Sequence, residues 1–206
     1  MSTPARKIKI RKANEALILE TAERVFALSG YQGASIAQIA REARLPKANV
    51  HYYFKTKLDL YRQVLEHILD DWMEEASSFD EYADPKQALR TYVQAKMEFS
   101  RKRPFGSRVW ASEIMAGAPV MERFLGTILK KWVDERARII RGWVRDGKID
   151  PVHPRALLYM IWGTTQHYAD FERQLVILNG GKAITERQYR ARTDQVVNLV
   201  LASVGL

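Results

Sequence analysis

The chain has 206 residues, and 47% of them are apolar, which is enough for one large domain or for a small domain beside a larger one. Its net charge of +9 is unevenly distributed, because residues 1–62 hold 12 Lys/Arg against 5 Asp/Glu, a net charge of +7, and the other residues have a net charge of +2. The positive field of the first third attracts polyanions. The absence of cysteine excludes disulfides and thiolate metal sites. The sequence shows no signal peptide, and none of its apolar stretches approaches the length of roughly 18 residues that a membrane span needs, so we expect a cytoplasmic protein.

A basic segment precedes the first predicted helix. Five of the seven residues from 6 to 12 are Lys or Arg, and we expect residues 1–13 to form a flexible arm that contacts DNA, although such runs are often only solubilising tails. The first helix is predicted over residues 14–28, with Gly30 as a left-handed C-cap. Its inward-facing residues are expected to be Ile18, Ala22, Val25 and Phe26.

The segment from Ser35 to Lys57, SIAQIAREARLPKANVHYYFKTK, has the pattern of a helix-turn-helix. Ser35 is the predicted N-cap of a helix of about two turns whose apolar residues recur at three- and four-residue steps. Pro46 ends this helix, because proline disfavours helical geometry in the residue before it, and it suits the start of a second helix. The second helix is expected to bury Val50 and Phe54 and to present donors and acceptors to DNA on its other face.

The rest of the chain also has helical periodicity, so we expect an all-α protein. A fourth helix is predicted to begin near Lys57 and to link the DNA-binding part to the next domain. Further helices are predicted over residues 85–101, 104–115, 120–145, 154–171 and 185–204. The predicted domains are an N-terminal helix-turn-helix domain of three helices over 14–60 and a C-terminal helical ligand-binding and dimerisation domain over 61–206.

A set of residues in the first third matches a known family. These residues are Gly30-Tyr31, Gly33, Ser35-Ile36, Ile39-Ala40, Ala43, Asn49-Val50-His51-Tyr52-Tyr53-Phe54, Lys57 and Leu60-Tyr61. Through them the chain resembles the TetR family of bacterial transcriptional repressors. The resemblance implies a homodimer that binds a palindromic DNA operator, with its two recognition helices roughly 34 to 36 Å apart or an adjustment of that distance. It also implies that a small molecule bound in the second domain releases the dimer from the DNA. It implies a DNA-facing set of Ser35, Lys47, Ala48, Asn49, His51, Tyr52, Tyr53 and Lys57.

The C-terminal part resembles a pyrimidine-utilisation regulator of this family and its close relatives. It does so at Ile68-Leu69-Asp70, Trp72, Ser107-Arg108, Glu113, 116–119, 142–144, 147–148, 160–162 and 165–171. The resemblance implies that the effector is a pyrimidine or a related nucleobase or catabolite. Trp110 stands where that regulator has a smaller aromatic residue, and a bulkier ring at a pocket wall would alter what fits.

A planar heterocycle needs aromatic faces and a few polar groups in the plane of its ring. The candidate effector-binding residues are Trp72, Arg108, Trp110, Glu113, Trp162, Gln166 and Tyr168. Gln166 follows Trp162 by four residues, so the two share one face of a helix. The alternatives remain open, because tryptophans also fill cores and interfaces, Gln166 could bond a neighbouring helix, and Arg108 and Glu113 could pair with each other or with solvent.

No catalytic residue, metal site or cofactor is predicted. His167 and Asp170 could orient a base, but no nucleophile accompanies them, so we expect a surface or interface pair. His67 and Asp71 lie one helical turn apart, yet no third metal ligand follows at a recognisable spacing. The segment 180–182, Gly-Gly-Lys, lacks the preceding strand of a phosphate loop and is predicted to be a turn between the last two helices.

The last two predicted helices carry more apolar side chains than one helical face can bury. These are Leu157, Leu158, Met160, Ile161, Val196, Val197, Leu199, Val200, Leu201 and Val204. We expect them to form a four-helix bundle with a second copy, and burial within one subunit is the alternative. The predicted function is a ligand-responsive transcriptional regulator, with repression expected from the resemblance. A DNA-packaging protein without sequence preference and a small-molecule enzyme are the two competing interpretations.

Overall fold

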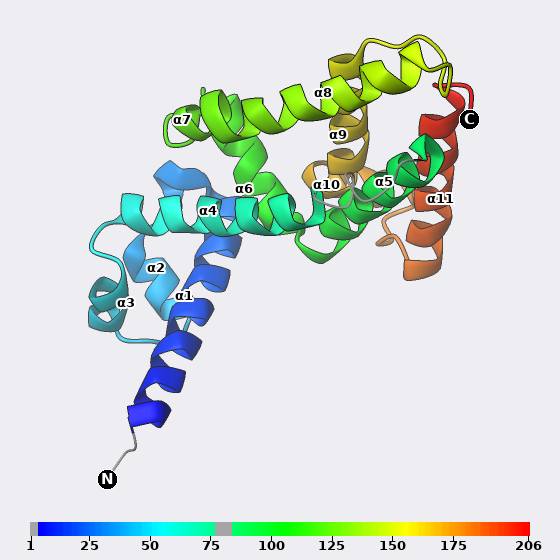
Figure 1. The fold of residues 1–206 in the computed structure, drawn as a ribbon. Coiled ribbons are helices and arrows are strands. Elements are labelled where there is room, and N and C mark those ends of the chain that lie inside the picture. Colours follow the sequence, from blue (N-terminus) through cyan, green and yellow to red (C-terminus); the bar gives the residue numbers. More distant parts are fainter. Residues whose placement is uncertain (1–3, 77–83) are drawn as a thin grey trace.

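The computed structural model describes residues 4–76 and 84–206, and these form an all-helical molecule (Figure 1). The N-terminal part consists of α1 (Pro4–Gly33), α2 (Ile36–Glu42) and α3 (Lys47–Tyr53), and α4 (Lys57–Ala76) leads from it into the C-terminal part. The C-terminal part contains α5 (Pro85–Lys102), α6 (Pro104–Met115), α7 (Glu122–Phe124), α8 (Lys130–Arg145), α9 (Pro154–Asp170), α10 (Glu172–Leu178) and α11 (Glu186–Ala202). The prediction of an all-α fold is confirmed.

Two clusters of buried apolar side chains form the core. The first cluster joins α1 to α4 with α6, and the second joins α5, α8, α9 and α11. The residues predicted to face inward on α1 and α3 belong to the first cluster and are each at most 1% exposed: Ile18, Ala22, Val25, Phe26, Val50 and Phe54. The helices α1 to α3 and the C-terminal body therefore have largely separate cores, which meet along α4 and α6.

Helix α1 begins ten residues earlier than predicted. It starts at Pro4, so residues 4–13, which were expected to form an arm outside the helix, are its first turns. Proline suits the first position of a helix, and residues 5–13 hold good helix formers without a glycine or a second proline, so helical geometry continues from the core outward. At the other end, Gly30 has φ +67° and interrupts the helix as predicted.

The segment 120–145, predicted as one helix, is divided. α7 passes through a π-helical turn, Leu125–Leu129, before α8 begins at Lys130. Gly126 lies inside this turn, and the Thr127 hydroxyl donates to the Arg123 carbonyl at 2.6 Å, a back-bond of the kind that bends helices. The short helix α10 was not predicted, but the turn at 180–182 is confirmed, with Gly180 and Gly181 at φ +69° and +79°.

In the part of the chain that the structure describes, none of the helices combines the length and the apolar character needed to cross a membrane.

Candidate functional site

The turn between α2 and α3 sets the orientation of α3. Ser35 caps α2, because its hydroxyl accepts the Gln38 N–H at 3.1 Å. After α2, Arg44 adopts φ +55°, and the Leu45 N–H donates to the Ala40 carbonyl at 3.0 Å, which closes the turn. α3 then packs Val50 against the first core cluster, so its opposite face points into solvent.

The predicted DNA-facing residues of α3 gather on this outer face. Lys47, Ala48, His51 and Tyr52 are exposed, and Asn49 and Tyr53 are half-buried. The rings of Tyr52 and Tyr53 meet edge to face with centroids 5.2 Å apart, which limits how far either ring can turn. A short helix that displays an amide, an imidazole, an ammonium and two phenols matches the donor and acceptor pattern of a major groove.

Lys57 and Ser35 have structural partners as well. The Lys57 ammonium donates to the carbonyl oxygens of Tyr31 at 2.8 Å and Ala34 at 3.1 Å, and it lies 4.4 Å from the centre of the Tyr31 ring. Two of its three N–H groups therefore fix the connection between α1 and α2, which leaves one for a phosphate. Ser35 is exposed, and its hydroxyl hydrogen remains available while the oxygen caps α2.

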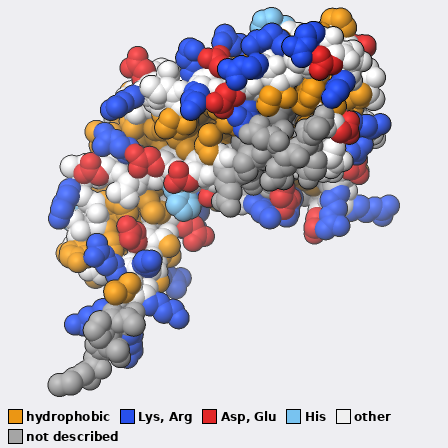
Figure 2. Space-filling view, viewed as in Figure 1, with side chains coloured by type: hydrophobic (Ala, Val, Ile, Leu, Met, Phe, Trp, Pro, Cys, Tyr) orange, Lys and Arg blue, Asp and Glu red, His pale blue; other side chains and the backbone are white. Residues whose placement is uncertain are grey.

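The first turns of α1 extend the basic surface beside α3. An open groove between them is lined by Lys7, Ile8, Ile10, Arg11, Tyr52 and Tyr53. Lys7 and Arg11 are one helical turn apart and share the face toward this groove, whereas Lys9 and Lys12 project from other faces of the helix. Figure 2 shows Lys and Arg side chains around this narrow end of the molecule.

A small cavity of about 80 Å³ lies at the junction of the two core clusters. Its lining residues are Leu69, Trp72, Met73, Tyr92, Lys96, Trp110, Phe124, Leu129, Trp132, Trp162 and Gln166. Trp72, Trp110 and Phe124 pack with the first cluster, Tyr92, Trp132 and Trp162 pack with the second, and Leu129 touches both. A molecule held here would contact both cores at once.

Four of the seven predicted effector residues line this cavity, namely Trp72, Trp110, Trp162 and Gln166. Sequence reasoning missed the polar residue that stands closest to them, Lys96. Its ammonium lies 3.9 Å from the centre of the Trp72 ring, and the side chain is 6% exposed. The signal was present, because Lys96 follows Tyr92 by four residues and interrupts the apolar face of α5.

The tryptophans of the cavity differ in what their indole N–H groups do. The Trp162 N–H donates to the Tyr92 hydroxyl oxygen at 2.6 Å. The N–H groups of Trp72 and Trp132 are buried and have no acceptor within the described residues. Burial raises the pKa of the Tyr92 phenol well above its usual range, so this hydroxyl stays neutral at physiological pH.

Three predicted effector residues, Arg108, Glu113 and Tyr168, lie outside this cavity. Arg108 donates from Nε to the Ala169 carbonyl at 3.0 Å and pairs with Glu172, so it ties α6 to the end of α9. Glu113 is 2% exposed and accepts hydrogen bonds from the Tyr61 hydroxyl and from the backbone N–H groups of residues 120 and 121. Helical periodicity does not reveal such partners, because they are far apart in the sequence.

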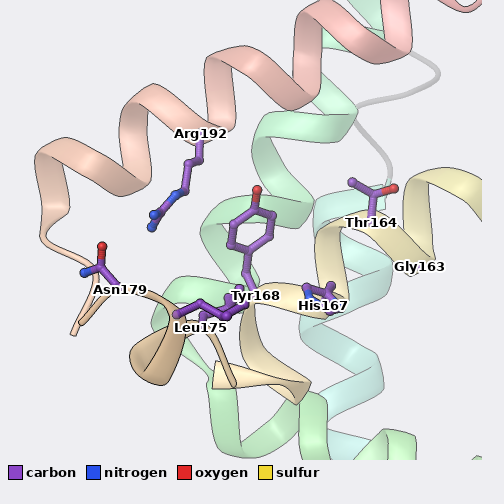
Figure 3. Close-up of a pocket in the computed structure, with 8 residues that line it drawn as sticks. Gly163, Thr164, His167, Tyr168, Leu175, Asn179 and Arg192 are labelled. Atoms are coloured by element: carbon purple, nitrogen blue, oxygen red, sulfur yellow. The ribbon is translucent and has the colours of Figure 1, made fainter. Parts of the chain in front are cut away.

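Tyr168, the third of them, lines a separate open hollow of about 650 Å³ between α9, α10 and α11. Figure 3 shows Arg192 extending from α11 toward Asn179 in this hollow. The same three helices carry exposed apolar side chains, namely Tyr159, Met160, Ile177, Leu178 and Leu199, of which Leu178 lines the hollow. Large exposed apolar patches of this kind mark interaction surfaces.

The residues weighed for other chemistry have structural roles. Arg103 pairs with Asp71 and approaches His67 Nδ1 at 3.3 Å, so both candidate metal ligands face a cation. Asp170 accepts from the Ser107 hydroxyl at 2.6 Å, while His167 stacks on Phe171. Across residues 4–76 and 84–206, no three His, Cys, Asp or Glu residues are grouped as a metal site would need.

Comparison with known proteins matches both parts of the chain to family models. Residues 18–64 match the family model of tetR-family bacterial regulatory proteins, and residues 65–206 match that of the C-terminal region of YcdC-like proteins. The HTH-type transcriptional regulator RutR of Escherichia coli (strain K12) is 35% identical over 204 residues, which cover 99% of this chain and 96% of RutR.

Solved structures agree at the level of the fold. The ketosteroid transcriptional regulator KstR2 of Mycobacterium tuberculosis superposes with a TM-score of 0.76 at 16% identity, over 91% of this chain and 92% of KstR2. AibR, solved in complex with isovaleryl coenzyme A and operator DNA, superposes with a TM-score of 0.69 at 21% identity, over 91% of this chain and 98% of AibR. These relatives are transcriptional regulators rather than enzymes.

Proposed function

This chain belongs to the TetR family of bacterial transcriptional regulators, and from that membership we propose that it is a homodimeric repressor whose affinity for a palindromic operator falls when a small pyrimidine-like effector binds. The observation that carries the proposal is the cavity at the junction of the two core clusters, because its aromatic lining includes residues of α4 and α6, which both pack against α1. We place the protein in the bacterial cytoplasm, on the nucleoid when it is bound to DNA.

Helices α4 and α6 connect the cavity to the DNA-reading part. Both contribute cavity residues, Trp72 from α4 and Trp110 from α6. At the same time α6 packs against α1, and at Gly106 it comes so close that a Cβ would lie 3.2 Å from Glu23 Oε1. Arg103, which precedes α6, pairs with Glu23. A ligand that shifts α6 relative to α4 therefore shifts α1 and the recognition helix with it.

The mechanism we propose is a shift in population. The effector fits better in the state whose two recognition helices have the wrong separation for the operator, and its differential affinity for the two states sets how much operator binding is lost. The aromatic cavity of about 80 Å³ is smaller than the roughly 150 Å³ that holds benzene, so a small ring must widen it by moving the lining side chains. A long acyl chain would have to widen it much further, since drug-sized sites need roughly 300 Å³ or more.

Dimerisation is proposed through α9 and α11. Of the ten apolar residues predicted for this face, Met160 is 40% exposed and Leu199 is 67% exposed, and Tyr159 is exposed beside them. The other eight are buried within the subunit, which is the alternative stated for them above. The open hollow between α9, α10 and α11 is lined by Arg192, whose buried Nη1 group has no acceptor within the described part of the chain. A monomer at micromolar concentration in sizing chromatography would contradict this assignment and leave Leu199 as an ordinary surface residue.

The effector class can be tested by thermal unfolding with a panel of pyrimidines, purines and their breakdown products, followed by operator binding. A ligand at 100 times its Kd is expected to add about 2.7 kcal/mol to the native state, because it binds the folded protein alone. The operator is first obtained by selection from random DNA, and fluorescence anisotropy then measures its affinity with and without ligand. We expect one pyrimidine both to raise the melting temperature and to release the operator.

Isovaleryl coenzyme A serves as the control ligand in that panel, because AibR was solved with it. Stabilisation by the acyl ester and by none of the nucleobases would overturn the pyrimidine assignment. Binding of random DNA as tightly as the selected operator would favour the DNA-packaging interpretation, since a packaging protein has no sequence preference.

The basic start of α1 is proposed to contact phosphates beside the site read by α3. Replacing Lys7 and Arg11 with alanine is expected to reduce the slope of log K against log salt by about 1.8, since each phosphate contact contributes roughly 0.9. The pair Lys9 and Lys12 is the matched control, because it removes the same charge from other faces of the helix. Equal changes for the two pairs would show a diffuse field instead of a specific contact.

A further inference from the structure

We propose that the indole N–H groups of Trp72 and Trp132 recognise the effector, which therefore presents oxygen acceptors on a small planar ring to each of them. The inference rests on the proposed function, and it names the chemistry by which that same site selects its ligand. Both tryptophans line the cavity, and both N–H groups are buried without an acceptor within residues 4–76 and 84–206.

A buried donor without an acceptor is uncommon in folded proteins. Most buried polar groups find a partner, and each exception calls for an explanation such as a ligand or an ordered water. Trp132 is 5% exposed, so bulk solvent does not satisfy its N–H group. Two such donors on one cavity of about 80 Å³ indicate a ligand with acceptors at two positions.

Trp162, another tryptophan of the cavity, provides the contrast. Trp162 lines the same cavity, but its N–H group already donates to the Tyr92 hydroxyl oxygen at 2.6 Å. Trp162 therefore offers a ligand its ring face, whereas Trp72 and Trp132 offer a ring and a donor. Lys96 adds positive charge beside the Trp72 ring, at 3.9 Å from its centre, and positive charge favours oxygen acceptors over further donors.

The two donors come from different parts of the core. Trp72 lies on α4 and packs against the first cluster, and Trp132 lies on α8 and belongs to the second. A ring that accepts hydrogen bonds from both indole N–H groups would connect α4 with α8. Helix α4 leads to the recognition helix, and α8 belongs to the C-terminal part that is proposed to form the dimer. Recognition of the two carbonyl groups and movement of α4 would then be a single event.

A double-mutant cycle between protein and ligand tests this assignment. Calorimetry measures the affinities of uracil, 2-thiouracil and 4-thiouracil for the native dimer and for Trp132→Phe and Trp72→Phe, which keep a ring and lose the N–H group. Sulfur accepts hydrogen bonds weakly, so the native protein is expected to prefer uracil over each thio analogue. In each variant the ratio between the Kd of one thio analogue and the Kd of uracil is expected to fall about tenfold or more, toward a ratio of 1.

Trp162→Phe is the matched control, because it removes an indole whose N–H group is already bonded within the protein. It should weaken all three ligands alike and keep the preference for uracil. If the native protein binds uracil but both test variants keep its preference for uracil over the thio analogues, the indole assignment alone would be overturned. A native protein that binds none of the three rings would overturn the pyrimidine effector as well.

Discussion

Replacing Glu113 with alanine is expected to lower the free energy of unfolding by about 3 to 5 kcal/mol, because it removes the acceptor of three hydrogen bonds at a buried position. The Glu113 carboxylate is 2% exposed and accepts from the Val120 N–H at 2.6 Å, from the Met121 N–H at 3.1 Å and from the Tyr61 hydroxyl at 3.1 Å. Alanine would leave these three donors without their acceptor, and each unsatisfied buried donor costs roughly 1 to 3 kcal/mol.

The loss has a structural consequence beyond stability. Glu113 fixes the turn after α6, and Tyr61, its partner on α4, packs edge to face on Phe26 of α1 with ring centroids 4.9 Å apart. Burial and the nearby Glu113 carboxylate both raise the pKa of Tyr61, so the phenol stays protonated and remains a donor at every pH at which the protein is used. The pair therefore joins the C-terminal body to the DNA-reading helices.

Urea unfolding followed by circular dichroism measures this effect. Glu113→Gln keeps one carbonyl oxygen and should lose less than Glu113→Ala. Glu122→Ala is the matched control, because Glu122 is exposed on neighbouring α7, and surface changes of this kind usually stay within about 0.5 kcal/mol. If Glu113→Ala cost no more than the control, the carboxylate would have no structural role and the effector assignment would need to be reopened.

Alanine at Asn49 or His51 is expected to weaken operator binding by about 1 to 3 kcal/mol and to relax the preference at one base position each. Both side chains stand on the outer face of α3, whose inner face is held by Val50 at 0% exposed. The expected loss is specific to the operator, because random DNA offers phosphates but not the matching base edges.

The measurement compares each variant on the selected operator, on operators changed at single positions and on random DNA. Lys47→Ala is the control, because an exposed ammonium that binds phosphate should weaken all sequences alike. Lys57 is unsuitable for this purpose, since its ammonium holds the carbonyl groups of Tyr31 and Ala34 and its loss would disturb the fold. Equal losses on operator and random DNA for Asn49 and His51 would contradict base reading.

Much of the DNA-binding part could be predicted from local sequence, and its success has a local cause. The cap at Ser35, the left-handed Gly30 and the buried pair Val50 and Phe54 depend on residues within one or two helical turns, so they leave a readable pattern. The same reasoning paired Trp162 with Gln166, which line one cavity. The extension of α1 to Pro4 was missed, because exposed basic residues suit a helix as well as an arm.

The effector cavity was decided by tertiary structure. Trp132 and Lys96 come from α8 and α5, and only packing brings them beside Trp72. The hydrogen-bond partners of Glu113 and Arg108 were not foreseen for the same reason, since they lie 7 to 64 residues away in the sequence. The sequence by itself determined most of the helices, the buried faces of α1 and α3, and the family, because these follow from local periodicity and motifs. Tertiary structure decided which polar groups face a ligand and which face one another, because that depends on how distant helices pack.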